Sequence, residues 1–232
     1  MPSILVTGAN RGLGMEFAKQ YSADGWRVFA CCRFPEKAGG LNDLAQTSKG
    51  RLSVHRLDVS QGDSVSSLAE SLRGEAIDIL LNNAGVYGDE GHDDFGRINY
   101  ERWAATFSVN VMGPMRMVEA FAENVSRGDR KVIAFLSSRM GSIGENTSGG
   151  SYLYRSSKAA LNAVVKSLSL DLRDRGLITV ALHPGWVQTD MGGQNAPTLP
   201  RESIQGLRKV LEGLQSKDSG GFLSYEGSQV PW

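Results

Sequence analysis

A tyrosine and a lysine four residues apart, Tyr154 and Lys158, form the most chemically suggestive pair in this sequence. They open a segment of helical period, and this spacing places both side chains on one face of a helix, one turn apart. A free phenol has a pKa of about 10, and each unit of lowering requires about 1.4 kcal/mol of preferential phenolate stabilisation. A neighbouring ammonium supplies part of that stabilisation. The pair therefore suits proton transfer, although the same spacing is also common on ordinary helix surfaces.

A glycine-rich turn near the N-terminus, Gly8-Ala9-Asn10-Arg11-Gly12-Leu13-Gly14, follows a short apolar run and precedes an amphipathic segment. Glycines let the backbone turn sharply and let a pyrophosphate approach the main chain, while a helix N-terminus supplies unpaired N–H groups. The first gap between glycines is one residue longer than in the general dinucleotide fingerprint. The strand before the turn and the helix after it strengthen the prediction of a dinucleotide site.

The residues after the second predicted strand distinguish between two nicotinamide cofactors. In NAD-binding forms, an acid about 20 positions beyond the glycines binds the ribose 2′-hydroxyl, whereas an arginine there accommodates a 2′-phosphate. This strand ends in Cys31-Cys32-Arg33 without a carboxylate, and Arg11 adds a second cation. The sequence therefore favours NADP(H). The alternative, that both arginines are ordinary solvated charges, leaves the missing acid unexplained.

Short β-rich runs alternate along the chain with segments of helical period. Several runs are apolar on successive residues, as parallel strands covered by helices on both faces require. Apolar side chains at helical spacing, such as Leu13, Phe17 and Tyr21, mark the buried stripes between them. We therefore expect an α/β fold with a doubly wound parallel sheet, its strands lying at residues 4–6, 27–30, 52–57, 77–81, 132–136, 178–182 and 222–223.

Asn99 is expected to cap a helix over residues 100–123 that bends at Gly113-Pro114, because proline lacks an N–H and clashes with the preceding turn. Residues 85–97 and 192–201 are polar, rich in Gly or Pro and weakly periodic, so we predict long loops. Such loops in compact α/β enzymes are often functional lids. We expect a substrate lid around residues 190–203.

Composition and charge exclude several classes of protein. The 232 residues carry 25 Lys+Arg and 25 Asp+Glu, a formal net charge of +0, so no attraction to nucleic acid is expected. No apolar run approaches the roughly 18–20 residues that a membrane-spanning helix needs. His55, His92 and His183 share no metal-ligand spacing, and no metal site is expected.

The adjacent cysteines, Cys31 and Cys32, do not form an ordinary disulfide, because neighbouring residues cannot reach its geometry without strain. The first residues lack the pattern of a signal peptide. We expect a cytoplasmic protein whose residues 1–232 form a single domain, with both thiols buried and structural.

These motifs occur, over nearly the whole chain, in the order typical of the short-chain dehydrogenases/reductases, and the sequence resembles that family. The matching residues are Thr7-Gly8-x-x-x-Gly12-x-Gly14, Leu57-Asp58-Val59, Asn82-Asn83-Ala84-Gly85, Asn110, Ser137-Ser138, Tyr154 with Lys158, and Pro184-Gly185-Trp186-Val187-Gln188-Thr189. More narrowly, residues 141–144, 149–154, 183–186 and 220–232 resemble the sniffer-type carbonyl reductases and the bacterial C-factor proteins. The resemblance implies a single-domain Rossmann-type fold of about seven strands flanked by helices.

The resemblance also implies a role for each matched residue. Ser138 would bind a carbonyl oxygen, and Tyr154 would donate the proton. Lys158 would hold the nicotinamide ribose and lower the pKa of the phenol, and Asn110 would hold a water in a proton relay. Ser137 is an alternative to Ser138, which we prefer because Ser-x-x-Gly with Gly141 matches the family form. The implied NADP(H)-binding residues are Gly8, Asn10, Arg11, Gly12, Leu13, Gly14, Arg33, Asp58, Val59, Asn83, Ala84, Gly85, Tyr154, Lys158, Pro184, Gly185, Val187 and Thr189.

The implied activity is NADPH-dependent reduction of a ketone or aldehyde, with a small carbonyl compound as partner. The rival is a C-factor-like signalling or interaction protein that keeps the cofactor-binding fold. A scaffold does not require all four catalytic residues, which favours the enzyme. Trp186 and Met191 are expected either to line the substrate pocket or to pack in the core or lid. The number of subunits is left open, with a homo-oligomer, dimer or tetramer, among the alternatives.

Overall fold

A parallel sheet forms the centre of the computed structural model, which describes residues 1–89 and 95–232. Within these residues the sheet has seven strands in the order β3-β2-β1-β4-β5-β6-β7. All neighbouring strands pair in parallel. The strands are β1 Ser3–Thr7, β2 Arg27–Cys32, β3 Leu52–Arg56, β4 Ile79–Asn82, β5 Val132–Leu136, β6 Ile178–His183 and β7 Gly221–Ser224.

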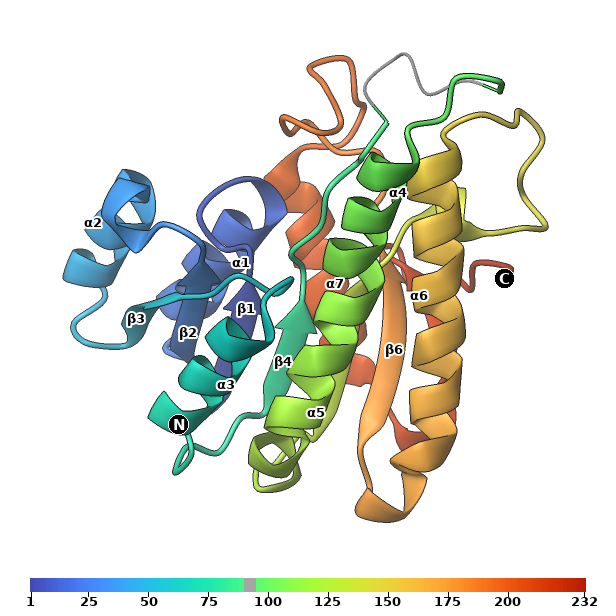
Figure 1. Ribbon diagram of the computed structural model, residues 1–232. Coiled ribbons are helices and arrows are strands. Elements are labelled where there is room, and N and C mark those ends of the chain that lie inside the picture. Colours follow the sequence, from blue (N-terminus) through green and yellow to red (C-terminus); the bar gives the residue numbers. More distant parts are fainter. Residues whose placement is uncertain (90–94) are drawn as a thin grey trace.

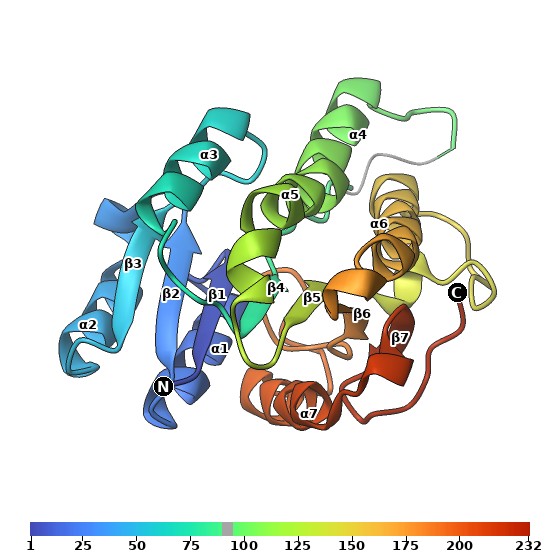
Figure 2. The ribbon, with the colours of Figure 1, turned by 90° about the horizontal axis from the view of Figure 1, so that it is seen from below.

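Helices cover both faces of this sheet (Figure 1, Figure 2). Helices α1 (Gly12–Ala23), α2 (Gly39–Thr47) and α7 (Pro200–Gly213) pack on one face. Helices α3 (Gly62–Ser71), α5 (Gly113–Ser126) and α6 (Tyr152–Asp171) pack on the other. The chain order reverses between β1 and β4, and ligands of doubly wound sheets bind at such a switch point, beyond the carboxyl ends of the strands.

Alternate residues of each strand enter different cores. In β1, Ile4 and Val6 pack with the α1 and α7 side, whereas Leu5 packs with Phe29 and Leu80 on the opposite side. Because both faces are buried, the strands are apolar without alternation. The predicted α/β doubly wound fold is confirmed. The strand predicted from residue 77 begins at Ile79, because the N–H of Ile77 instead donates to the carbonyl of Asn124.

The helix predicted over residues 100–123 is interrupted before its proline. It consists of α4 (Tyr100–Phe107), a π-helical turn over residues 108–112, and α5, which ends at Ser126. The predicted cap is present, since Oδ1 of Asn99 accepts a hydrogen bond of 2.9 Å from the N–H of Arg102. The irregularity therefore lies in the π-helical turn over residues 108–112, directly before Gly113 and Pro114. Such turns concentrate at functional sites, and this one contains Asn110.

The two predicted loops lie at the carboxyl edge of the sheet, at the top of Figure 1. Residues 190–199 are irregular, and residues 200–203 form the first turn of α7. The substrate lid expected around residues 190–203 stays a prediction. Residues 90–94 of the other loop, with His92, lie outside the described residues. No helix in the described part of the chain is both long enough and apolar enough to cross a bilayer.

Candidate active site

The glycine turn forms the floor of a cleft at the carboxyl end of β1. Gly8 and Gly12 have φ angles of +67° and +54°, a region that favours glycine. A Cβ atom on Gly14 would lie 2.3 Å from the carbonyl oxygen of Gly8, so a larger residue does not fit. Arg11, at the start of α1, provides no side-chain cap. The uncapped first turn of α1 therefore offers N–H groups to an anion such as a pyrophosphate.

The cleft has a volume of about 430 Å³ and runs along the ends of β2, β4 and β5. Most of the predicted cofactor residues line it. Gly185 and Val187 line an adjoining cavity instead, and Pro184 lines neither; its carbonyl accepts a hydrogen bond of 2.6 Å from Oγ of Ser203. The predicted residues in the cleft are Gly8, Asn10, Arg11, Gly12, Leu13, Gly14, Arg33, Asp58, Val59, Asn83, Ala84, Gly85, Tyr154, Lys158 and Thr189.

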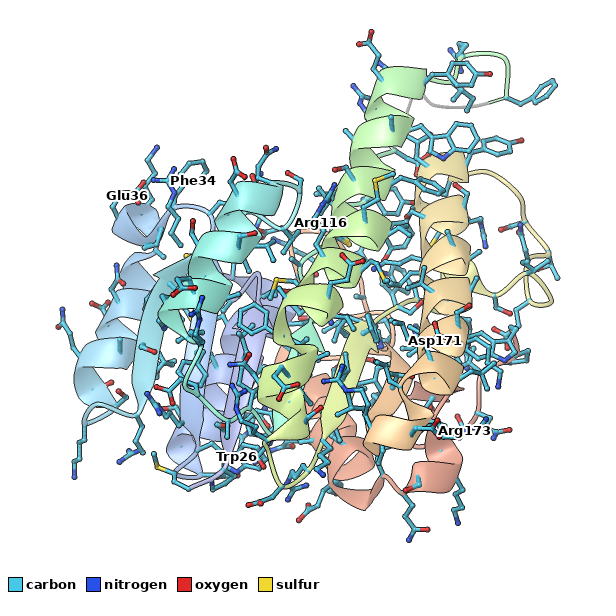
Figure 3. All side chains as sticks on the ribbon, turned by 60° about the horizontal axis from the view of Figure 1, so that its bottom comes forward. Trp26, Phe34, Glu36, Arg116, Asp171 and Arg173 are labelled. Carbon is cyan, nitrogen blue, oxygen red and sulfur yellow. The ribbon has the colours of Figure 1, made fainter. Side chains whose placement is uncertain are left out.

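Cations gather where the cleft passes the end of β2. The Arg33 guanidinium and the Lys37 ammonium lie 5.9 Å and 5.3 Å from the ring centroid of Phe34, which is half exposed. Phe34 and Glu36 stand at the outer edge of the molecule (Figure 3). Sequence reasoning missed Lys37, although its spacing of four from Arg33 was a signal. These cations suit a phosphate group at this end of the cleft.

Arg11 differs from Arg33 because it already has a partner. Its guanidinium forms an ion pair of 2.8 Å with Asp190, and both side chains are largely exposed, at 70% and 76%. Exposed ion pairs of this kind contribute at most about 1 kcal/mol. The pair therefore links the glycine turn to the segment after β6 without fixing Arg11 there.

Tyr154 and Lys158 project from the first turns of α6, and both are buried. Nζ of Lys158 donates a hydrogen bond of 2.7 Å to the carbonyl of Leu136 and lies 5.6 Å from the ring centroid of Tyr154. Burial lowers the pKa of Lys158 to about 8. The predicted pairing on one helix face is therefore present, with the ammonium above the ring.

The phenol of Tyr154 has the opposite pKa shift from the one expected. Burial raises its pKa to about 12, the side chain of Ser138 opposes part of this rise, and Tyr87 adds to it. The ammonium of Lys158 faces the carbonyl of Leu136 and the ring, so desolvation dominates. The phenol is thus protonated at neutral pH, which is the form that donates a proton.

The two candidate serines lie in different surroundings. Ser138 lines the cavity beside Tyr154, and its Oγ accepts a hydrogen bond of 3.2 Å from the N–H of Met140. Ser137 is buried, lines the cofactor cleft, and donates a hydrogen bond of 2.6 Å to Oδ1 of Asn162. This placement favours Ser138 as the residue that meets a substrate.

Asn110 holds the chain that follows β4. Its Nδ2 donates to the carbonyl of Val86 (2.8 Å) and to Oγ of Ser157 (3.0 Å), while Oδ1 accepts from the N–H of Val86 (2.9 Å). Both Nδ2 protons are therefore used by the protein. The predicted role of Asn110 in a water relay stays a prediction.

A second cavity, of about 630 Å³, adjoins the cleft at Tyr154. This volume is typical of sites for small organic ligands. Trp186 and Met191 both line it, which decides between the alternatives left by the sequence. Sequence reasoning missed most other lining residues, because they come from separate segments without a shared motif. They include Tyr87, Met140, Glu145, Arg155, Tyr225 and Glu226.

His183 and the two cysteines are uncharged at neutral pH. His183 lines the second cavity, its Nδ1 accepts a hydrogen bond of 3.2 Å from the N–H of Arg139, and burial, aided by Arg139, lowers its pKa to about 4. Burial raises the pKa of the Cys31 and Cys32 thiols. Neither cysteine therefore has the character of a nucleophile.

Comparisons with known proteins agree with this geometry. Residues 2–199 match the family model described as short chain dehydrogenase. The chain is 47% identical over 156 residues to the C-signal protein of Myxococcus xanthus, covering 67% of this chain and 93% of that protein.

Solved structures of similar proteins, carbonyl reductases among them, cover the whole of this chain. The carbonyl reductase Sniffer of D. melanogaster is similar with a TM-score of 0.93 and 33% identity, over 100% of both chains. The NADPH-bound carbonyl reductase from chicken fatty liver is similar with a TM-score of 0.92 and 34% identity, over 100% of this chain and 99% of that one. The chain therefore belongs to the short-chain dehydrogenase/reductase family, in its sniffer and C-factor group, and is an oxidoreductase that uses a nicotinamide cofactor.

Proposed function

We propose that this protein reduces a ketone or aldehyde with NADPH, with Tyr154 as the proton donor and Ser138 as the hydrogen-bond donor to the carbonyl oxygen. One observation carries the proposal: Tyr154 lines both the cofactor cleft and the 630 Å³ cavity. A group at this junction reaches a ligand in the cavity and a cofactor in the cleft. Ser138 lines the cavity beside it.

The cleft fits a dinucleotide that carries an additional phosphate. Gly8 and Gly12 line the cleft without a side chain and with positive φ angles, so a pyrophosphate can approach the backbone of the turn. Arg33 and Lys37, at the other end of the cleft, favour a 2′-phosphate. The chicken carbonyl reductase, similar over the whole chain, was solved with NADPH. When bound, NADPH supplies the hydride, and the protein supplies position and electrostatics.

The buried side chains suit carbonyl reduction. The phenol of Tyr154 is protonated at neutral pH, so it carries the proton to donate as negative charge develops on the carbonyl oxygen, and a bound cofactor and the ammonium of Lys158 would have to offset the raised pKa. A hydrogen bond from Oγ of Ser138 would stabilise the same oxygen. Lys158, whose ammonium is held at the carbonyl of Leu136, would exchange that partner for a ribose hydroxyl of the cofactor. Residues 190–199, with Trp186, would select the substrate.

The identity to C-signal favours a second candidate, a signalling or interaction protein that retains the cofactor site. Catalysis and signalling make different demands on the site, since surface recognition does not require a proton donor between two cavities. The position of Tyr154 therefore supports the enzyme over the scaffold.

Purified protein assayed with a panel of aldehydes, ketones and quinones tests the proposal, with NADPH and NADH consumption as the measurement. At least one carbonyl class should consume NADPH in proportion to the alcohol formed. If the protein binds NADPH but consumes none with any member of the panel, the signalling candidate replaces the enzyme.

A further inference from the structure

Helix α6, which carries the proposed proton donor, begins without a cap of its own. The residue before it, Ser151, has a φ of +47° and makes no side-chain cap hydrogen bond. The first N–H groups of a helix have no partners within the helix and must find them elsewhere. Tyr154 lies in this first turn, so the partner that holds the turn also holds the backbone of Tyr154.

That partner is Asp89, which precedes Tyr154 by 65 residues. Its Oδ2 accepts a hydrogen bond of 2.9 Å from the N–H of Tyr154, and its Oδ1 accepts one of 3.3 Å from the N–H of Leu153. A carboxylate is favoured at a helix N-terminus because the helix dipole is positive there. Asp89 therefore binds the main chain of the proton donor through both carboxylate oxygens.

A second residue of the same segment, Tyr87, contacts the side chain of the proton donor. The rings of Tyr87 and Tyr154 have centroids 4.8 Å apart and are inclined by 36°. The hydroxyl of Tyr87 lies 2.8 Å from Oγ of Ser151. Residues 87–89 thus hold the first turn of α6 at its backbone, at its N-cap and at the ring of Tyr154.

The segment that carries these residues begins in the cofactor cleft. Gly85 lines the cleft, and both backbone polar groups of Val86 bond to the side chain of Asn110. Three residues later the chain reaches Asp89. Figure 1 shows this stretch leaving β4 and rising beside α4, and the hydrogen bonds that Asp89 accepts come from the start of α6. The same short stretch therefore connects the cofactor cleft to the proton donor.

We propose that Asp89 is a positioning residue for carbonyl reduction, fixing the first turn of α6 so that the phenol of Tyr154 stays beside Ser138 and the ring stays under Lys158. The inference rests on the proposed function and adds a residue outside the motifs that the sequence shows. Asp89 does not line either cavity. Its effect should therefore appear in turnover and leave NADPH affinity unchanged.

Two substitutions at Asp89 and one control separate positioning from general stability. Asp89→Ala should lower kcat about tenfold, since small misplacements of catalytic groups cost up to roughly 10²-fold, while Asp89→Asn, which keeps one acceptor oxygen, should fall between Asp89→Ala and wild type. The NADPH Kd should stay within twofold in both variants. The control is Asn99→Ala, which removes the cap of α4 and should leave kcat within twofold. An unchanged kcat in both Asp89 variants, or an equal loss in the control, would overturn the proposal.

The same substitutions in a Tyr154→Phe background test the mechanism of the effect. If Asp89 acts by placing the phenol hydroxyl, removing that hydroxyl should abolish the effect of Asp89→Ala on the single-turnover rate. A further tenfold fall in the double variant contradicts positioning and indicates a structural role. Should Asp89→Ala fail to fold, Asp89→Asn in both backgrounds decides the question. Wild-type protein inactive with every carbonyl compound refutes the proposed function itself, whereas an active wild type with insensitive Asp89 variants refutes this inference alone.

Discussion

The cofactor cleft and the substrate cavity share one wall at Tyr154 but are built in different ways. The cleft is formed by short motifs at the ends of adjacent strands, with backbone such as that of Gly8 and Gly14 at its floor. The cavity is formed by residues from six separate segments, among them Met140, Trp186 and Tyr225. One region therefore depends on local backbone conformation, and the other on how distant loops pack.

This difference explains which substitutions each of the two regions tolerates. A Cβ atom at Gly14 collides with the backbone, so the cleft tolerates little change there. Trp186 is 59% exposed, and Nε1 of its side chain donates a hydrogen bond to the carbonyl of Gly192. Substitution of such a side chain reshapes the cavity without disturbing the sheet. The fold can therefore keep one cofactor while accepting different substrates.

Removing the phenol hydroxyl at the shared wall should have the largest effect. Tyr154→Phe keeps the ring and its packing against Tyr87, so NADPH affinity should stay within a few-fold, while turnover falls by about 10²–10⁴, the usual contribution of general acid catalysis. Calorimetry and steady-state kinetics measure the two quantities. The matched control is Tyr152→Phe on the same helix, whose side chain is 37% exposed. Near-normal carbonyl reduction by Tyr154→Phe would contradict the assignment.

A change confined to the cleft should alter cofactor choice alone. Arg33 favours a 2′-phosphate, so wild type should bind NADPH at least about tenfold tighter than NADH, or about 1.4 kcal/mol. Arg33→Asp should reverse this preference by replacing the phosphate partner with an acceptor for a 2′-hydroxyl. Calorimetry with both cofactors measures it. The control is Arg173→Asp, which changes the net charge equally at a distant surface (Figure 3) and should leave the preference for NADPH unchanged. Equal affinities of the wild type for NADPH and NADH would contradict the prediction.

The buried ammonium of Lys158 should lower the free energy of unfolding of the protein. Its pKa is lowered to about 8 in the folded state, below the ordinary value of about 10.4 in the unfolded chain. Between these two pKa values the unfolded chain binds more protons than the folded protein does, so Lys158 makes the free energy of unfolding rise with pH from about 8 upward. Below pH 8 the destabilisation by the buried ammonium is complete.

Replacing the buried ammonium should therefore stabilise the protein at neutral pH. Lys158→Met should raise the free energy of unfolding at pH 7 by about 1–2 kcal/mol, since the carbonyl of Leu136 loses its partner and offsets part of the gain. Urea denaturation at pH 7 and at pH 9.5 measures the effect, which should be smaller at the higher pH. NADPH binding and turnover should weaken together. If Lys158→Met is less stable than the wild type at pH 7, burial of the ammonium does not destabilise the folded protein.

The smallest effect is expected from a change confined to the cavity. Trp186→Ala should raise KM for bulky carbonyl compounds by about two- to fivefold, because the cavity loses one apolar wall, and the NADPH Kd should not change. Trp186→Phe, which keeps an aromatic face, should restore most of the loss. A large change in cofactor affinity would mean that the two regions are not separable.

The fold and the cleft could be predicted from sequence because their signals are local. Continuous apolar runs, such as that of β5, identify buried parallel strands, and the glycine spacing identifies a turn that only small residues permit. Sequence reasoning missed Lys37 because its spacing of four from Arg33 is a weak signal until the turn over residues 35–37 brings both cations to the ring of Phe34.

The catalytic environment could be predicted only in part. The pair Tyr154 and Lys158 was evident from spacing, but the raised pKa of the phenol was not, because burial depends on packing against distant segments such as Tyr87. Asp89 was equally invisible, since its partner lies 65 residues away and no motif connects them. The cavity lining shares this property, with residues brought together by loops from opposite ends of the chain.

Hydride transfer from NADPH to a carbonyl carbon is tested most directly with deuterium-labelled cofactor. Wild-type protein would be incubated with a reactive carbonyl compound and NADPH deuterated in either of the two C4 positions of the nicotinamide, and the alcohol examined by mass spectrometry and NMR. One of the two labelled cofactors should deliver one deuterium to the carbinol carbon, and the other should deliver none. Alcohol that carries no label from either cofactor, or no alcohol at all despite bound NADPH, would contradict carbonyl reduction at the junction of the two cavities.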